Sequence, residues 1–505
     1  MSVLSIKKHK WKIITAFVLI ALYFFTRLVS LTQLPIFVDE AIYLRWAQIA
    51  KNDANWRFIS LTDGKQPLFV WATMVMMRFI RDPITAGRLV STITGLISMI
   101  IIWAISWLLF GNIRLAFLSS LIYLVSPFSL VYDRMALMDS MVGTFSLLSL
   151  LLAIIMIKTL RLDVALILGA VLGGGILTKT SGFLNIYLLP LTLLLFNWSA
   201  RKRRPPISGL LRWLALAFLA VLISQLFYSV LRLSPFFHII NQKNTLFVFP
   251  LKEWLKDPFF YFKSHLNGLS NWLISYLTWP LIFLVVYSLL DFRNHFREKL
   301  LLFGWFAVPF MGLVTFGNIL YPRFIFSMSL PLFILIAWSL NDFSHRLKKK
   351  AVWLGAVLLL LIVPLSIDFK LLFNPKTAPI ARSDRDQYIL SWPAGYGVKE
   401  IITFVKQQAE KGKIFLATEG TFGLMPAAFE LYLWDNPNVE IKGFFPVEKI
   451  PEEVLEKAKI MPTYFVFNET IQVPGNFPLK LIAEYQRPLP RYSMRLYQVV
   501  PSLNQ

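Results

Sequence analysis

Two adjacent carboxylates follow the first apolar stretch of the chain. Asp39 and Glu40 lie in the run LPIFVDEAIY, where the chain is expected to leave a hydrocarbon environment. An ionisable side chain this close to lipid costs several kcal/mol unless it is hydrated or paired, so such residues are candidates for function. The pair could serve acid–base chemistry. Asp39 could equally be the cap of a helix that begins at Ala41.

Further polar residues lie at the ends of later apolar stretches. Singly, each has a structural explanation: Asp139 could cap a helix, with Arg134 as its ion-pair partner. Lys65 and Lys179 could extend to lipid headgroups, and Arg323 could anchor the chain at the interface. Together, carboxylates and cations on one side of a membrane favour a shared site. The candidates beyond Asp39 and Glu40 are Lys65, Asp133, Arg134, Asp139, Lys179, Tyr321 and Arg323.

The composition indicates a polytopic membrane protein. The 505 residues are 56% hydrophobic and 15% aromatic, with a mean hydropathy of +0.61, far above that of a soluble domain. The net charge of +23 does not indicate nucleic acid, because the basic residues form short runs between apolar stretches, as in loops that face anionic lipid. No cysteine is present, which excludes disulfides and thiolate metal sites.

The apolar stretches predict a mainly α fold, a transmembrane helical bundle. A span needs roughly 20 apolar residues, and on that rule there are about eleven. The run MSVLSIKKHKWK before the first span lacks a small-residue cleavage site and predicts an uncleaved first helix. The predicted spans are 12–31, 84–110, 113–130, 139–157, 164–180, 183–197, 209–230, 271–290, 299–317, 323–341 and 351–368.

Basic residues predict the orientation of the bundle. With the N-terminus inside, alternate connections carry the Lys and Arg residues, as the positive-inside rule requires. The apolar segment 67–80 is short, and if it spanned the membrane it would put the basic loops outside, so we place it in the interface with a helix near 41–51. The basic residues are Lys7, Lys8, Lys10, Lys12, Arg114, Lys158, Arg161, Arg201, Lys202, Arg203, Arg204, Arg293, Arg297, Lys299, Arg346, Lys348, Lys349 and Lys350.

This orientation divides the chain into a membrane domain, 1–370, and an extracytoplasmic domain, 374–505. The loops expected outside are 32–83, 131–138, 231–270 and 317–323, together with Thr178 and Lys179. The last 130 or so residues alternate strand-like and amphipathic segments, which predicts a small α/β domain. Within it, SWPAGYGVKE (391–400) could stack on sugar or cover the domain junction, and ATEGTFGLMP (417–426) could contact an acceptor or simply connect a strand to a helix.

Such a set of residues could transfer a sugar from a lipid phosphate. Phosphate is already a good leaving group, so the reaction needs no general acid of the kind glycosidases use. It needs one carboxylate to take the proton of the attacking hydroxyl, and cations to hold the departing phosphate. Arginine binds two phosphate oxygens with its planar fork, and lysine adds a point charge. A single base opposite the leaving group predicts inversion at the anomeric carbon.

The ordered motifs resemble those of the GT-C glycosyltransferases. They are the DE pair, GKQPL (64–68), YDRMALMD (132–139), TKTSG (178–182) and YPRF (321–324). The most similar branch is the protein O-mannosyltransferase family with its bacterial relatives, the aminoarabinose transferases of lipid A and the proteins with an RgtA/B/C/D-like domain. The resemblance covers roughly residues 10–370, and the tail is similar to the periplasmic domain that many of them carry.

The resemblance implies a donor and a set of roles. The donor would be a polyprenyl-phosphate-linked sugar, and transfer would occur on the outer face of what the bacterial relatives suggest is a plasma membrane. Asp39 would be the base with Glu40 beside it, and Lys65 and Arg323, with Tyr321, would bind the donor phosphate. The second loop would contribute Arg134 and Asp139 beside Asp133, with Lys179 as a weaker match. Where relatives often have two prolines, this chain has Gln66 and Pro67.

No cofactor is expected. The mannosyltransferase branch generally works without a metal, although some related oligosaccharyltransferases hold a divalent ion, which leaves a metal as the less favoured alternative. His238 and His265 are too far apart in sequence to suggest a metal pair. Acceptor hydroxyls on protein, lipid or a growing glycan all fit the same chemistry.

Two other classes of function remain as alternatives. A lipid or polysaccharide transporter would place charged or broken-helix sites near the bilayer midplane, often in two repeated halves. The ionisable residues here lie at span ends, and no internal repeat is evident. A non-catalytic membrane scaffold would account for the C-terminal domain but would leave the clustered loop charges without a purpose.

Overall fold

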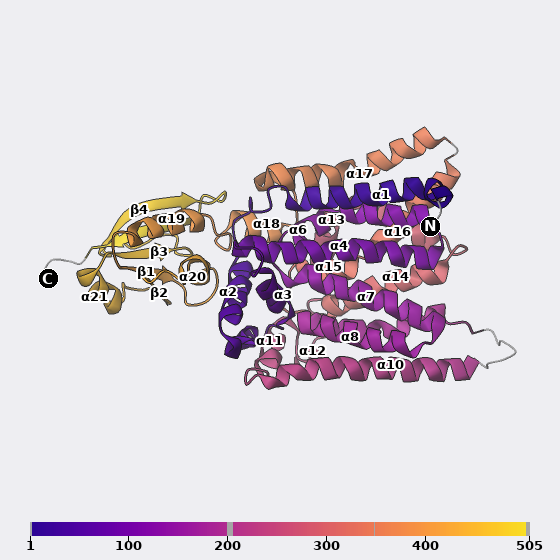
Figure 1. Cartoon of the computed structure of the whole chain (residues 1–505), viewed down its shortest axis with the longest axis horizontal. Coiled ribbons are helices and arrows are strands. Elements are labelled where there is room, and N and C mark those ends of the chain that lie inside the picture. Colours follow the sequence, from indigo (N-terminus) through magenta and orange to yellow (C-terminus); the bar gives the residue numbers. More distant parts are fainter. Residues whose placement is uncertain (1–2, 199–205, 348, 501–505) are drawn as a thin grey trace.

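The computed structural model describes residues 3–198, 206–347 and 349–500. Long helices form an elongated bundle, and a sheet domain lies beyond one end of it, while the N-terminus lies at the other end (Figure 1). The bundle helices are α1 (Val3–Leu28), α4 (Pro83–Phe110), α5 (Ile113–Leu124), α7 (Met138–Thr159), α8 (Leu162–Thr178), α10 (Pro206–Ser229), α13 (Phe262–Leu290), α14 (Phe296–Phe316), α15 (Arg323–Ser329), α16 (Leu332–Arg346) and α17 (Lys350–Phe373).

The helices agree with the predicted spans. In the part of the chain that the structure describes, seven helices are long and apolar enough to cross a membrane, and α15 with α16, bent by 49°, would form an eighth. Three shorter apolar helical segments, 113–124, 162–178 and 180–195, coincide with the remaining predicted spans. The last of these consists of η3 (Thr180–Phe183), α9 (Leu184–Leu188) and η4 (Leu189–Leu195). The chain is an integral membrane protein.

Small residues allow close helix packing in the bundle. A Cβ atom on Gly169 of α8 would lie 2.7 Å from Ile223 of α10, and one on Gly173 would lie 2.5 Å from Phe227. These two glycines are one turn apart, the small-residue spacing through which membrane helices approach each other. This contact holds α8 in place, and Lys179 directly follows the C-terminal end of α8.

Two helices lie across the end of the bundle that faces the sheet domain. They are α2 (Val38–Asn52) and α3 (Leu68–Met76), which lie between the bundle and the sheet domain (Figure 1). The nine residues of α3 are far fewer than a span requires, in agreement with the interfacial placement predicted for 67–80. The same end holds η1 (Ala54–Trp56), η2 (Ile59–Asp63), α6 (Pro127–Tyr132), η5 (Val230–Leu233), α11 (Ile239–Phe247) and α12 (Leu251–Trp254).

The sheet domain is the small α/β domain that the sequence predicts. Its strands are β1 (Ile414–Glu419), β2 (Val439–Phe444), β3 (Thr463–Phe467), β4 (Leu479–Gln486) and β5 (Ser493–Val499). Their order is β2-β1-β3-β5-β4; β1, β2 and β3 are parallel, and β4 and β5 add an antiparallel pair. The linker holds η6 (Pro375–Thr377), α18 (Arg382–Arg385) and η7 (Asp386–Leu390), and the domain's helices are α19 (Val398–Ala409), α20 (Ala427–Leu433) and α21 (Glu452–Ile460).

One apolar core is continuous from the bundle into the sheet domain. Leu416 of β1 belongs to the same cluster of buried side chains as the bundle, whereas Phe415 and Ala417 face a second cluster on the other side of the sheet. This alternation follows from the period of two residues in a strand. The continuous core holds the sheet domain against the bundle end.

The basic sets used to predict orientation lie at connections between bundle helices. Arg114 follows the first residue of α5, Lys158 lies in the last turn of α7, and Arg346 ends α16. The predicted set at 201–204 and Lys348 lie outside the described residues.

Candidate active site

A cleft opens between the bundle end and the sheet domain. Its volume is about 290 Å³, at the lower limit of the range of roughly 300–1,000 Å³ that is typical of small-molecule sites. Four of the predicted residues line its bundle side: Asp39, Lys65, Tyr321 and Arg323. The opposite side comes from the sheet domain and its linker: Trp392, Glu419, Gly420, Phe422, Gly423, Leu424, Met425, Asn468 and Glu469.

Asp39 and Arg323 form an ion pair in this cleft. Arg323 Nη1 lies 2.5 Å from Asp39 Oδ2, and the side chains are 13% and 23% exposed, respectively. Phe37, not Asp39, is the residue before the first turn of α2, so the capping role considered for Asp39 is wrong. Asp39 is instead in the first helical turn, where a carboxylate is favoured by the helix dipole. Its Oδ1 atom remains available to a substrate.

Glu40 points away from the cleft into the bundle end. It is fully buried, and Arg88 donates to both of its oxygens, Nε to Oε1 at 2.9 Å and Nη2 to Oε2 at 2.7 Å. The backbone amides of Ala136 and Phe37 also donate to these oxygens, at 2.7 and 3.0 Å. Consecutive residues in a helix point about 100° apart, so Glu40 cannot face the cleft beside Asp39. The predicted catalytic role of Glu40 is therefore corrected to one of holding α2 in place.

Lys65 reaches the cleft from a tight turn. Gly64 before it adopts a φ of +67°, and a Cβ there would lie 2.8 Å from Lys243 Cγ, so both backbone conformation and space favour glycine. Burial lowers the pKa of the Lys65 ammonium, and the nearby carboxylates of Asp39 and Asp63 oppose this shift. Asp63 is itself paired with Lys243.

Tyr321 stacks beside the arginine of the cleft. The guanidinium carbon of Arg323 lies 4.9 Å from the centre of the Tyr321 ring and 5.9 Å from that of Phe324. These cation–π contacts restrict the guanidinium and direct it toward Asp39. Tyr321 thus lines the cleft, as predicted, and also orients Arg323.

Asp139 and Lys179 form a second ion pair close to the first. Lys179 Nζ lies 2.6 Å from Asp139 Oδ1 and 4.7 Å from the centre of the Phe324 ring. Neither Asp139 nor Lys179 lines the cleft. The ion pair between Asp139 and Arg134 that the sequence suggested does not form. Asp139 is paired with Lys179 instead.

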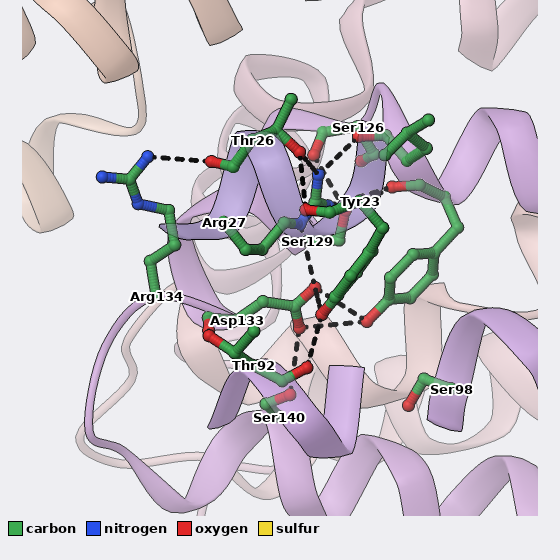
Figure 2. Close-up of polar contacts among 12 residues, drawn as sticks. Tyr23, Thr26, Arg27, Thr92, Ser98, Ser126, Ser129, Asp133, Arg134 and Ser140 are labelled. Carbon is green, nitrogen blue, oxygen red and sulfur yellow. Dashed lines mark hydrogen bonds and ion pairs between the residues drawn. The ribbon is translucent and has the colours of Figure 1, made fainter. Parts of the chain in front are cut away.

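Asp133 is buried inside the bundle (Figure 2) and does not line the cleft. It accepts hydrogen bonds from Tyr23 and Tyr123, at 3.1 and 3.0 Å, and from Ser140 at 3.0 Å. Arg27 Nε lies 3.5 Å from Asp133 Oδ2. This network ties α1, α5 and α7 together, so the predicted site role of Asp133 is corrected to a structural one. The signal in the sequence for this network was Arg27, an ionisable residue near the end of the first span.

Arg134 also has a structural place. It donates to the backbone carbonyls of Thr26, Val29 and Ser30 at 3.0, 2.9 and 2.9 Å, and Figure 2 shows its guanidinium extended toward Thr26. These carbonyls belong to the end of α1, where cationic side chains commonly satisfy the last free acceptors of a helix. The predicted role of Arg134 in the second acidic and basic loop of the site is therefore also corrected.

The sheet-domain side of the cleft was only partly foreseen. Trp392, Phe422 and Glu419 lie in the two segments considered as possible sugar or acceptor contacts. Asn468 and Glu469, which follow β3, were missed because they look like an ordinary strand end. Among the described residues, no group of three or more His, Asp or Glu side chains could hold a metal ion, and the expectation about metal remains a prediction.

Comparisons with known proteins agree on the fold. Residues 64–228 match a family model described as dolichyl-phosphate-mannose-protein mannosyltransferase. The search of curated proteins finds no match. The structure of ArnT from Cupriavidus metallidurans is similar over 99% of both chains, with 17% identity and a TM-score of 0.61. A second structure of that protein, bound to undecaprenyl phosphate, is similar over 98% of this chain and 99% of the other, with 16% identity and a TM-score of 0.61.

A more distant match covers less of the other protein. The oligosaccharyltransferase AglB from Archaeoglobus fulgidus, in complex with an inhibitory peptide and a dolichol-phosphate, is similar over 92% of this chain and 70% of AglB, with 12% identity and a TM-score of 0.52. The chain has the GT-C fold that the ordered motifs predicted, and its small sheet domain follows the helical bundle.

Proposed function

We propose that this chain is a membrane glycosyltransferase that moves a sugar from a polyprenyl-phosphate donor to a hydroxyl acceptor. The observation that carries the proposal is the cleft in which the carboxylate of Asp39 faces the same space as Lys65 and Arg323. The family match and the ArnT fold support it, and the lipid phosphates bound in the ArnT and AglB structures support the donor class. They favour a transferase over a transporter or a scaffold.

The proposed reaction is a single displacement. Asp39 Oδ1 takes the proton of the acceptor hydroxyl while that oxygen attacks the anomeric carbon. The bond between this carbon and the phosphate oxygen breaks, and the phosphate leaves with the electron pair. Lys65 and Arg323 stabilise the charge that develops on the phosphate. Attack opposite the leaving group inverts the anomeric carbon, and NMR of the product would reject this scheme if the configuration were retained.

In this scheme the chain's own cations stabilise the charge that a bound metal ion could stabilise in other enzymes. Lys65 and Arg323 supply positive charge at the departing phosphate, and no cofactor takes part. We further propose that the N-terminal end of the bundle is cytoplasmic in a bacterial plasma membrane, which places the cleft and the sheet domain outside. Basic residues at the alternate connections support that orientation.

The experiment replaces Asp39 by Asn in a strain whose own copy of the gene is deleted. Loss of a general base typically costs about 10²- to 10⁴-fold in rate, so mass spectrometry should find accumulated polyprenyl-phosphate sugar and no glycosylated product, as in the deletion strain. Asp435→Asn, at an exposed position of the sheet domain, is the matched control and should restore the product. A wild-type level of product with Asp39→Asn would reject Asp39 as the base.

A further inference from the structure

The sheet-domain side of the cleft has the features of a binding site. It is formed where the parallel strands β1 and β3 end, with Glu419 as the last residue of β1 and Asn468 and Glu469 just after β3. In open α/β sheets, ligands bind outside the carboxyl ends of parallel strands. Here that edge faces the bundle side of the cleft, so whatever binds to it lies opposite Asp39. We call Trp392, Glu419, Phe422, Asn468 and Glu469 the far wall.

Buried hydrogen bonds hold Trp392 in place on this far wall. Asn468 Nδ2 donates to the carbonyl of Trp392 at 3.4 Å. Arg487, which is buried, donates to the Ala394 carbonyl at 3.0 Å and also to the side chain of Asn468. The linker strand and the end of β3 are thereby locked together. Trp392 is half-buried and lines the cleft, which gives the wall an aromatic side chain on a backbone that hydrogen bonds hold in place.

The far wall is acidic, and one carboxylate is free to face the cleft. The oxygens of Glu419 accept the backbone amides of Asn468, Glu469 and Thr470 at 2.7, 2.8 and 3.1 Å, so this carboxylate is used within the domain. Glu469 is exposed and lines the cleft. Burial of part of its carboxyl and the nearby Glu419 raise the pKa of Glu469, which Arg487 opposes. Among the described residues that line the cleft, both cations, Lys65 and Arg323, are on the bundle side.

We infer that the far wall binds the acceptor, and that the acceptor is an uncharged carbohydrate. An aromatic platform suits the apolar face of a sugar ring, and the carboxylate of Glu469 accepts hydrogen bonds from its hydroxyls. A phosphorylated acceptor would face Glu469 and Glu419 without a cation on that wall, and like charges placed together are unfavourable. The inference rests on the proposed function and adds the acceptor class and the residues that select it.

The test uses the full chain in nanodiscs, probed on an array of neutral oligosaccharides and their phosphorylated forms. The wild-type chain should bind at least one neutral glycan and bind its phosphorylated form more weakly. Trp392→Ala should weaken neutral-glycan binding by about tenfold or more, as truncation of a central aromatic contact does. Glu469→Gln should weaken it less and should reduce the preference for the neutral over the phosphorylated form, because the repulsive charge is gone.

Matched variants separate recognition from folding. Trp434→Ala and Glu456→Gln, exposed in the same domain away from the cleft, should bind as the wild type does, and all variants should keep the wild-type Tm. The inference is overturned if the chain binds no neutral glycan, if phosphorylated forms bind as well or better, or if both far-wall variants bind normally. Retained transfer in Asp39→Asn would reject the proposed base and would leave the glycan-binding result standing.

Discussion

At the scale of single residues, the cleft depends on which charges are paired and which are accessible. One carboxylate oxygen of Asp39 accepts a hydrogen bond from Arg323. Both oxygens of Glu40, in contrast, accept hydrogen bonds from Arg88 and from backbone amides. Lys65 is different again, because burial lowers its pKa and no carboxylate among the described residues forms an ion pair with it. A buried lysine without a permanent ion-pair partner is suited to bind a transient anion such as a phosphate.

The lowered pKa of Lys65 predicts the pH dependence of donor use. A lysine is charged below its pKa, so lowering the pKa makes the ammonium lose its proton at a lower pH than the usual value near 10.4. In the free enzyme, kcat/KM for the lipid-phosphate donor should therefore fall on the alkaline side at a pH below that of an ordinary lysine. Lys65→Arg should move this fall to higher pH, because a guanidinium stays protonated up to about pH 12.

The measurement is kcat/KM against pH, with donor extracted from the deletion strain. Lys252→Arg, an exposed lysine in α12, is the control and should leave the profile unchanged. An alkaline fall at the same pH in Lys65→Arg as in the wild type would show that another group is responsible.

At the scale of elements, the position of α2 decides whether the site exists. Three connections hold its first turn: the Glu40–Arg88 ion pair, the hydrogen bond from Val38 N to the Pro393 carbonyl at 3.2 Å, and the edge-on contact of Phe37 with Tyr388, 4.8 Å between ring centres. They come from the bundle and from the linker of the sheet domain. Asp39 is thus placed by both parts of the molecule.

Breaking the buried ion pair should lower the stability of the fold, and transfer should fall only as a consequence. Removal of one partner leaves a buried charge unpaired and typically costs about 3–5 kcal/mol, so Glu40→Gln should lower the Tm measured in detergent and should lower transfer in proportion. The double variant Glu40→Leu with Arg88→Met removes both charges and should recover part of that Tm. Recovery should be partial, because Arg88 also donates to the Leu31 and Leu34 carbonyls.

Arg78→Met, at an exposed position near the end of α3, is the control for the loss of an arginine and should keep the wild-type Tm. If Glu40→Gln kept that Tm and lost all transfer, Glu40 would act in the reaction after all.

The sequence is informative about elements and less so about the directions of side chains. Spans follow from long apolar stretches, and the order of the motifs indicated the GT-C fold. The roles of Glu40, Asp133 and Arg134 could not be read in this way, because most of α2 and the segment around 133 are buried, so polar residues there do not mark the side that faces the cleft. Part of the far wall was missed for another reason: Asn468 and Glu469 are brought beside Trp392 only through strand pairing and linker contacts that are remote in sequence.

At the scale of the whole molecule, the site requires both domains in contact. Arg45 of α2 lies 2.9 Å from Glu430 of α20, and Gln48 donates to the Leu431 carbonyl at 2.9 Å. Trp46 also contacts Phe422, at 6.3 Å between ring centres. The helix that carries Asp39 is therefore the same one on which the sheet domain rests. A shift of that domain would change both walls of the cleft at once.

The orientation of the molecule in the membrane can be tested with single cysteines, because the natural chain has none. Lys256→Cys between α12 and α13 and Glu456→Cys in α21 introduce thiols on the side of the cleft and the sheet domain. Arg114→Cys and Arg297→Cys introduce them at basic connections of the bundle, and all four positions are exposed. The positive-inside rule predicts that a membrane-impermeant maleimide labels only the first two in intact cells.

After permeabilisation, all four cysteines should be labelled, which controls for reactivity. Labelling of Arg114→Cys or Arg297→Cys in intact cells, with Lys256→Cys protected, would put the cleft in the cytoplasm. In that case the donor would have to present its sugar on the cytoplasmic leaflet, and the proposed extracytoplasmic transfer would be wrong even if Asp39 were the base. If instead Lys256→Cys and Glu456→Cys differed from each other, the cleft itself would be wrong, because its two walls would lie on opposite sides of the membrane.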